Sequence, residues 1–183
     1  MNRAATDSFG ARPIHAAAEH GSAAVIDCLL AAGALVDSRN SLGVTALIAA
    51  SREGKLEAVR SLIRGGADVN LVCISPQGFS FTALMLASRN NHPSVVEALL
   101  EAGADANFAC PLTGRTALML ACHHGCKACV CALLAGGADP RMVSHKGSTA
   151  LSFAASKNHP AIAALLEAKL REFSAGGGGG GSV

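Results

Sequence analysis

The sequence is poor in aromatic side chains and in net charge. It contains no Trp and no Tyr, and 15 Lys and Arg against 13 Asp and Glu leave a formal charge of only +2. Proteins that read nucleic acids generally combine a strong basic field with stacking aromatics, so we expect no nucleic-acid partner. No apolar run approaches the roughly 18 residues of a membrane span, and the first residues lack the pattern of a secretory signal. We therefore expect a soluble protein that does not bind membranes.

Signatures of catalysis are also missing. The sequence has no glycine-rich nucleotide-binding motif, no H-E-x-x-H zinc-protease motif and no G-x-S-x-G nucleophile motif. We therefore predict no catalytic residues and no cofactor. The seven Cys are an odd number without the spacing of a disulfide framework, which indicates reduced thiols and a cytoplasmic or nuclear location.

Two features are abundant: alanine, which occurs 37 times, and a short phrase that recurs five times. The phrase reads RPIHAAA in the first copy, then TALIAAS, TALMLAS, TALMLAC and TALSFAA, and the copies begin at Arg12, Thr45, Thr82, Thr116 and Thr149. The intervals are 33, 37, 34 and 33 residues. Small side chains favour closely packed helices, and this period is typical of a solenoid of stacked units.

Each copy contains signals for two short helices. The Thr that opens four of the phrases suits an N-cap, and nine residues later stands a residue that tolerates the left-handed conformation: Gly21, Gly54, Asn91, Gly125 and Asn158. A second helix follows, whose apolar stripe includes Val25, Val59, Val95 and Cys129. In the first four copies it ends at a glycine, which Leu170 replaces in the fifth, so the last helix is expected to run on.

These signals predict an all-α solenoid of five helix–turn–helix units joined by hairpin-like loops. The repeats are expected at about 10–42, 43–79, 80–113, 114–146 and 147–173. We expect residues 1–9 to be a flexible N-terminus. Residues 174–183 are rich in glycine and are expected to form a disordered tail, or equally a linker to something outside this chain.

The 33-residue unit, the TALMLA phrases and the phrases GADVN, GADAN and GADP are similar to the ankyrin repeat, whose own phrases are T-P-L-H-x-A and G-A-D-V-N. Ala replaces the Pro of that motif at four positions: Ala46, Ala83, Ala117 and Ala150. Only His15 keeps the motif's His, and the other copies carry Ile48, Met85, Met119 and Ser152. These departures indicate a more apolar seam between repeats.

The resemblance implies a non-enzymatic protein–protein interaction module, working as an adaptor, scaffold or inhibitor and expected to be a monomer. The family binds partners on the concave face formed by hairpin tips and first helices. By register, the candidate partner-binding residues are Arg52, Phe79, Phe81, Arg89, Arg115, His123, His124, His145 and Lys146. Since Arg and Lys outnumber Glu on this face, we predict an acidic peptide or acidic patch as partner. An alternative is a targeting domain or fragment of a larger effector protein.

Two aromatic residues and two asparagines extend this interpretation. The longest interval between repeats holds Phe79 and Phe81, which either anchor a partner or fold back over the tops of the repeats. The family resemblance also implies hydroxylation sites at Asn70 and Asn107.

A cluster of Cys and His between residues 122 and 131 suggests a metal site at first sight. The repeat register instead predicts that Cys122 and Cys129 are small buried residues, that His123 and His124 are exposed, and that their side chains diverge. A Cys/His metal-binding protein is therefore the less favoured alternative, and we predict no metal ligands. Cys131 is predicted to be an exposed thiol. Cys73 and Cys110 are predicted to be free thiols at successive hairpin tips, because stacked units are too far apart for a bridge.

Overall fold

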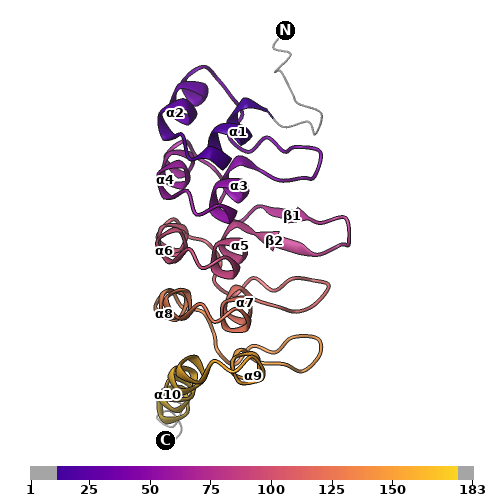
Figure 1. The fold of residues 1–183 in the computed structure, drawn as a ribbon, viewed down its shortest axis with the longest axis vertical. Helices are drawn as coiled ribbons and strands as arrows, with labels where there is room; N and C mark the ends of the chain where they lie inside the picture. Colours follow the sequence, from indigo (N-terminus) through magenta and orange to yellow (C-terminus); the bar gives the residue numbers. More distant parts are fainter. Residues whose placement is uncertain (1–11, 177–183) are drawn as a thin grey trace, which may run out of the picture.

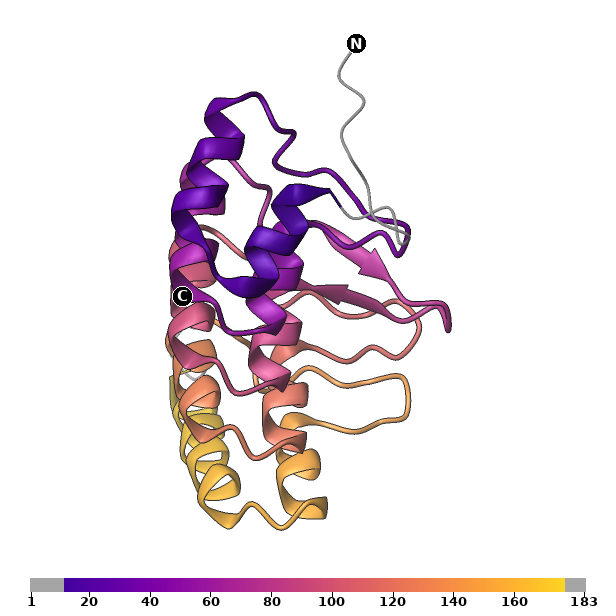
Figure 2. The same ribbon diagram turned by 45° about the horizontal axis from the view of Figure 1, so that its top comes forward.

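The structure is a computed structural model that describes residues 12–176, without the side chains of residues 175 and 176. Five helix pairs are stacked in chain order along one axis (Figure 1). The first helices form one layer, the second helices form another, and the loops between pairs project together from the first-helix side (Figures 1 and 2). The elements are α1 Pro13–His20, α2 Ala23–Ala31, α3 Ala46–Arg52, α4 Leu56–Arg64, β1 Val72–Ile74, β2 Ser80–Thr82, α5 Ala83–Arg89, α6 Pro93–Glu101, α7 Ala117–His123, α8 Lys127–Ala135, α9 Ala150–Ser156 and α10 Pro160–Gly176.

The start and end of each first helix follow from the repeated phrase. The hydroxyl oxygens of Thr45, Thr82, Thr116 and Thr149 accept hydrogen bonds from the backbone N–H three residues later, at 3.2–3.3 Å. Nine residues after the phrase begins, the chain is left-handed in every repeat, with φ between 58° and 83°. The predicted all-α solenoid and its helix signals are therefore confirmed.

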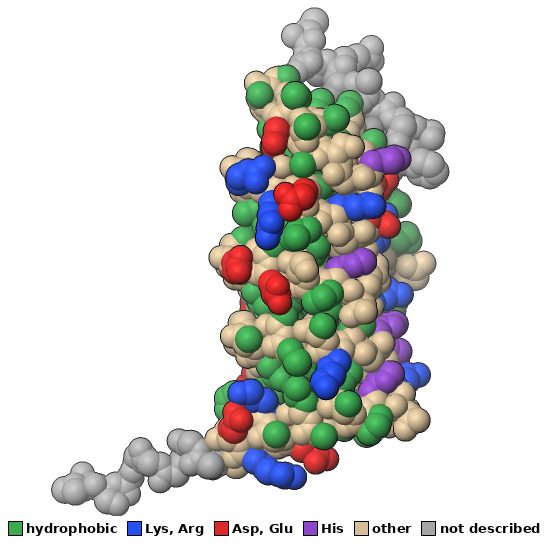
Figure 3. Space-filling model, turned by 60° about the vertical axis from the view of Figure 1, so that its left-hand side comes forward, with side chains coloured by type: hydrophobic (Ala, Val, Ile, Leu, Met, Phe, Trp, Pro, Cys, Tyr) green, Lys and Arg blue, Asp and Glu red, His purple; other side chains and the backbone are tan. Residues whose placement is uncertain are grey.

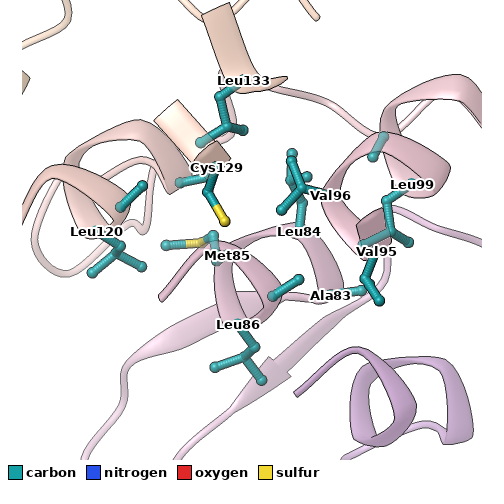
Figure 4. Packing of buried hydrophobic residues seen from close by; sticks show 14 of the residues in the cluster. Ala83, Leu84, Met85, Leu86, Val95, Val96, Leu99, Leu120, Cys129 and Leu133 are labelled. Atoms are coloured by element: carbon teal, nitrogen blue, oxygen red, sulfur yellow. The ribbon is translucent and has the colours of Figure 1, made fainter. Parts of the chain in front are cut away.

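A continuous apolar core joins each pair to the next. Ile48, Met85 and Met119, which stand where the repeat motif has His, are each 1% exposed. Figure 4 shows this seam between the third and fourth pairs, where Met85 of α5 lies beside Cys129 of α8. Each fully buried Leu or Val contributes about 1.5–3 kcal/mol to stability. The predicted apolar seam is confirmed, and each repeat depends on its neighbours to cover it.

The ends of the stack differ from its middle. Val25 was expected in the buried stripe of the second helix but is 50% exposed, whereas Ala58, Val95, Cys129 and Ile162 at the same register are at most 3% exposed. This position faces the preceding repeat, and no described helix pair precedes α1 and α2. At the other end Ser152, in the register of Met85, is exposed for the corresponding reason.

Histidine and glycine interlock between some repeats. The Nε2 of His92 lies 3.1 Å from the carbonyl oxygen of Arg52, and the ring covers Gly54 so closely that a Cβ there would lie 2.4 Å from Nδ1. His159 covers Gly125 in the same way, at 2.5 Å. These two glycines also have positive φ, so steric contact and backbone conformation both exclude a larger residue.

The loops are linked to one another by side chains. Asn70 donates through Nδ2 to the carbonyl oxygen of Gly103 and accepts from the N–H of Asp105. Asn107 makes the equivalent pair of bonds to Gly137 and Asp139. Both asparagine side chains are therefore engaged in holding one loop against the next, whereas their predicted hydroxylation is untested and remains a prediction.

The loop between the second and third repeats forms a two-stranded antiparallel hairpin, in which Val72 pairs with Thr82 and Ile74 pairs with Ser80. Cys73 and Cys110 were predicted at hairpin tips, and this was wrong: they are 6% and 2% exposed. Both thiols pack into the hydrophobic core before the chain reaches the loop tip, and Cys73 lies in β1, where it pairs with Phe81 of β2. Both are free thiols, as predicted.

The last helix passes Leu170 and continues to Gly176, as expected from the missing glycine. It therefore extends three residues into the segment predicted as a tail. The remainder of that segment, and the predicted flexible N-terminus at residues 1–9, lie outside the described residues.

Candidate functional site

A hollow of about 780 Å³ lies between the loops and the first helices of the third, fourth and fifth repeats. The β1–β2 hairpin and the loops around residues 110–115 and 144–148 form one wall of the hollow, and the ends of α5 and α7 form the other. We call this hollow the groove. Its lining residues are Ser75, Gln77, Phe79, Phe81, Met85, Arg89, Cys110, Leu112, Thr113, Arg115, Leu120, His123, His124, Ser144, His145, Lys146, Ser148 and Phe153. None of them is acidic.

Eight of the nine candidate partner-binding residues come together in this groove: Phe79, Phe81, Arg89, Arg115, His123, His124, His145 and Lys146. The ninth, Arg52, lies outside it. The guanidinium of Arg52 pairs with Glu19 at 3.4 Å and with Glu53 at 2.8 Å. Its charge is therefore already compensated by two carboxylates.

The loop wall has an apolar patch, formed by Phe79 and Leu112, beside Arg115, His145 and Lys146 on the same wall. The rings of Phe79 and Phe81 lie 6.4 Å apart at an interplanar angle of 33°. Phe81 is half-buried and packs against the core, whereas Phe79 is 37% exposed and Leu112, on the next loop, is 52% exposed. Each of the two alternatives therefore applies to one residue of the pair. Phe81 packs over the repeats, whereas Phe79 is exposed to solvent and available to a partner.

The opposite wall is basic. Arg89 ends α5, His123 ends α7 and His124 caps α7. The two imidazole rings meet edge to face with centroids 4.8 Å apart. His123 is half-buried instead of exposed as predicted, and its Nδ1 has no hydrogen-bond partner in the described part of the chain.

The positive neighbourhood alters the titration of both histidines. Burial lowers the pKa of His123, and His124, Lys157, Arg115 and Arg89 lower it further. Burial also lowers the pKa of His124, together with the charges of Arg89, Arg115, Lys157 and His159. Both imidazoles are therefore mainly neutral at pH 7, and an approaching negative charge would favour their protonation.

Phe153 was not identified from the sequence, although it organises the floor of the groove. Its ring lies 4.8 Å from the guanidinium carbon of Arg115 and 5.9 Å from the ring of His123, edge to face. The cation–π contact holds Arg115 in place before any ligand arrives. The available signal was the register, because Leu86 and Leu120 occupy the same position in the preceding repeats.

The positive charges of this region are not compensated within the described residues. Arg89, Arg115, Lys146 and Lys157 form no ion pair there, in contrast to Arg52. On the side of the second helices, charges of both signs are interspersed (Figure 3), with pairs such as Arg60–Glu57 and Arg64–Asp27. The groove therefore gathers several positive charges that have no acidic partner within the described residues.

The Cys residues of α7 and α8 differ in burial. Cys122 and Cys129 are fully buried, as predicted, and burial raises the pKa of each thiol to about 12, with Cys126 adding to the effect. Cys131 is exposed, also as predicted. Over residues 12–176, no three His, Cys, Asp or Glu side chains are grouped in a way that could hold a metal ion.

Cys110 differs from these thiols. Burial raises its pKa, but hydrogen bonds from the Thr113 side chain and from backbone groups of Ser80, Leu112 and Thr113 outweigh burial and lower the pKa overall. Cys110 therefore contributes a polarised sulfur to the groove floor.

No helix in the described part of the chain is long and apolar enough to cross a membrane.

Comparison with known proteins agrees with this architecture. Residues 1–73 and 84–174 match the family described as ankyrin repeats (3 copies), and residues 47–100 match ankyrin repeats (many copies). The chain is also similar to ankyrin repeat domain-containing protein 29 of Danio rerio, with 46% identity over 56 residues. That stretch covers 30% of this chain and 19% of the relative. Because the family match extends over most of its length, this chain belongs to the ankyrin repeat family.

Proposed function

We propose that this chain is a non-enzymatic module that binds an acidic segment of a partner protein in the groove. Ankyrin repeats are generally protein–protein interaction modules, and the family is generally non-enzymatic. The observation that carries the proposal is the gathering of uncompensated cations, Arg89, Arg115 and Lys146, around a hollow that also exposes Phe79.

Electrostatics explains why an acidic partner fits. Bringing carboxylates between several cations with no competing acid gives attraction at every contact and speeds the encounter of the two molecules. Arg115 is already held against Phe153, so little side-chain freedom is lost when it binds a carboxylate. Exposed aromatic and Arg side chains at the centre of a hollow are also the residue types that dominate binding energy in protein interfaces.

The stacked repeats suit an adaptor, a scaffold or an inhibitor, because they present the groove on a continuous packed core. We further propose that the chain acts as a monomer in the cytoplasm or the nucleus, where its free thiols stay reduced.

The proposal can be tested by affinity capture from native lysate followed by direct binding measurements with the captured partner. The test variant is Arg89→Glu/Arg115→Glu, and the matched control is Arg60→Glu/Arg64→Glu, which makes the same charge change on α4 away from the groove. We expect the test variant to lose about 100-fold in affinity for an acidic partner and the control to lose little. Equal losses in both variants, or none in either, would rule out the groove as the binding site.

A further inference from the structure

The groove contains an apolar patch, Phe79 and Leu112, which we call the apolar wall, and a basic cluster, Arg89, His123 and His124 at the ends of α5 and α7 with Arg115 close by, which we call the basic wall. Phe81 lies directly before the N-cap of α5, and Arg89 is the last residue of that helix. The seven residues of α5 rise about 10 Å at 1.5 Å per residue, so the backbones of Phe81 and Arg89 lie at opposite ends of this helix.

We propose that the groove selects a single amphipathic partner segment, with apolar side chains along one edge and acidic side chains along the other. The apolar edge contacts Phe79 and Leu112, and the acidic edge contacts Arg89, His123 and His124. This inference rests on the proposed function and adds the pattern that the partner must carry.

A segment with only acidic or only apolar side chains would have an unfavourable contact with one of the two walls. A uniformly acidic segment would place carboxylates against the exposed faces of Phe79 and Leu112, where they would lose water and gain no hydrogen bond. A uniformly apolar segment would bury the guanidinium groups of Arg89 and Arg115 without an opposite charge. Only a segment with two different edges gives both walls a favourable contact.

The size of the groove supports one segment as its occupant. A volume of about 780 Å³ lies within the range of ligand pockets and is small for anything larger than one short segment.

The proposal is tested with short synthetic peptides of equal negative charge. One peptide carries Leu along one edge and Glu along the other, and the second has Ser in place of every Leu. We expect the amphipathic peptide to bind the wild-type chain about tenfold more tightly, because only it covers the apolar wall. Isothermal titration calorimetry measures both affinities.

The variant Phe79→Ser/Leu112→Ser should abolish this preference, so that it binds the two peptides with equal affinity. The matched control is Leu42→Ser, since Leu42 is 52% exposed like Leu112 but lies on a loop outside the groove. If the Phe79 substitution lowers the melting temperature, Leu112→Ser alone serves as the test variant.

Equal binding of the two peptides to the wild-type chain would overturn the amphipathic pattern while leaving the acidic-partner function intact. The same holds if the hairpin variant keeps the full preference. Failure of both peptides to bind, together with capture that does not depend on Arg89 and Arg115, would instead overturn the proposed function.

Discussion

The first two repeats and the last three share one scaffold but differ in the charges that they expose. Near the N-terminus the exposed ends of the first helices carry Glu19, Arg52 and Glu53, which pair with one another. In the third to fifth repeats the equivalent positions carry Arg89, His123, His124 and Lys157, without an acidic residue among them. The comparison teaches that the repeat motif specifies the stack, whereas the residues that vary at fixed register positions specify what the stack can bind.

Substitution of the glycines that contact histidine should reduce the stability of both halves by similar amounts. Gly54→Ala and Gly125→Ala should each lower the free energy of unfolding by about 3–5 kcal/mol, because the new Cβ would collide with His92 or His159 and the backbone has positive φ. Gly33→Ala keeps the positive φ but meets nothing within 4 Å, so its cost should be about 1 kcal/mol. Urea unfolding measures all three, and similar losses at Gly33 and Gly54 would contradict the interlocking role of histidine.

Only the basic half should show pH-dependent binding. The pKa values of His123 and His124 are lowered in the free chain, and an acidic partner raises them, so the complex holds more protons than the free protein. Affinity for an acidic peptide should therefore rise as the pH falls, by about fivefold between pH 7.5 and 5.5, and level off once both free imidazoles are protonated.

The control for this pH dependence is His123→Asn/His124→Asn, which should flatten most of the profile at the same peptide concentration. An unchanged profile in the double variant would contradict the role of these two imidazoles. A profile that falls toward acid pH would contradict the sign of the effect.

The acidic residues of the first half can be removed to make the two halves more alike. Glu19→Gln/Glu53→Gln frees the guanidinium of Arg52 and should raise the affinity for a long acidic peptide by about twofold at low salt. The variant Glu57→Gln/Glu167→Gln makes the same charge change on the second helices and should have a smaller effect. Equal gains would attribute the change to overall charge instead of to Arg52.

Much of the fold was predictable because its signals are local. The Thr caps, the left-handed residues nine positions later and the apolar seam each depend on a few neighbouring residues, and all are confirmed. The register also brought most of the candidate residues into one groove. Predictions failed where packing across repeats decides the outcome: Val25 is exposed because no described helix pair precedes it, and Cys73 and Cys110 are buried because their side chains pack into the core.

The contrast between local signals and contacts across repeats also explains which residues of the candidate site the sequence predicted. Arg52 resembles Arg89 in sequence, yet its partner Glu19 is 33 residues away and neutralises it. Phe153 has no distinguishing motif, and its contact with Arg115 forms only when the fourth and fifth repeats stack. Charge compensation and side-chain stacking across repeats therefore require the three-dimensional structure.

The central claim is that binding is confined to the groove of the third to fifth repeats. Chemical-shift mapping by nuclear magnetic resonance, during titration with the amphipathic acidic peptide, tests it most directly. The largest changes should fall on Phe79, Arg89, Arg115, His123 and His124, with little change at Glu19 and Arg52. Changes centred on the ion-paired first half, or on the second helices, would contradict the account.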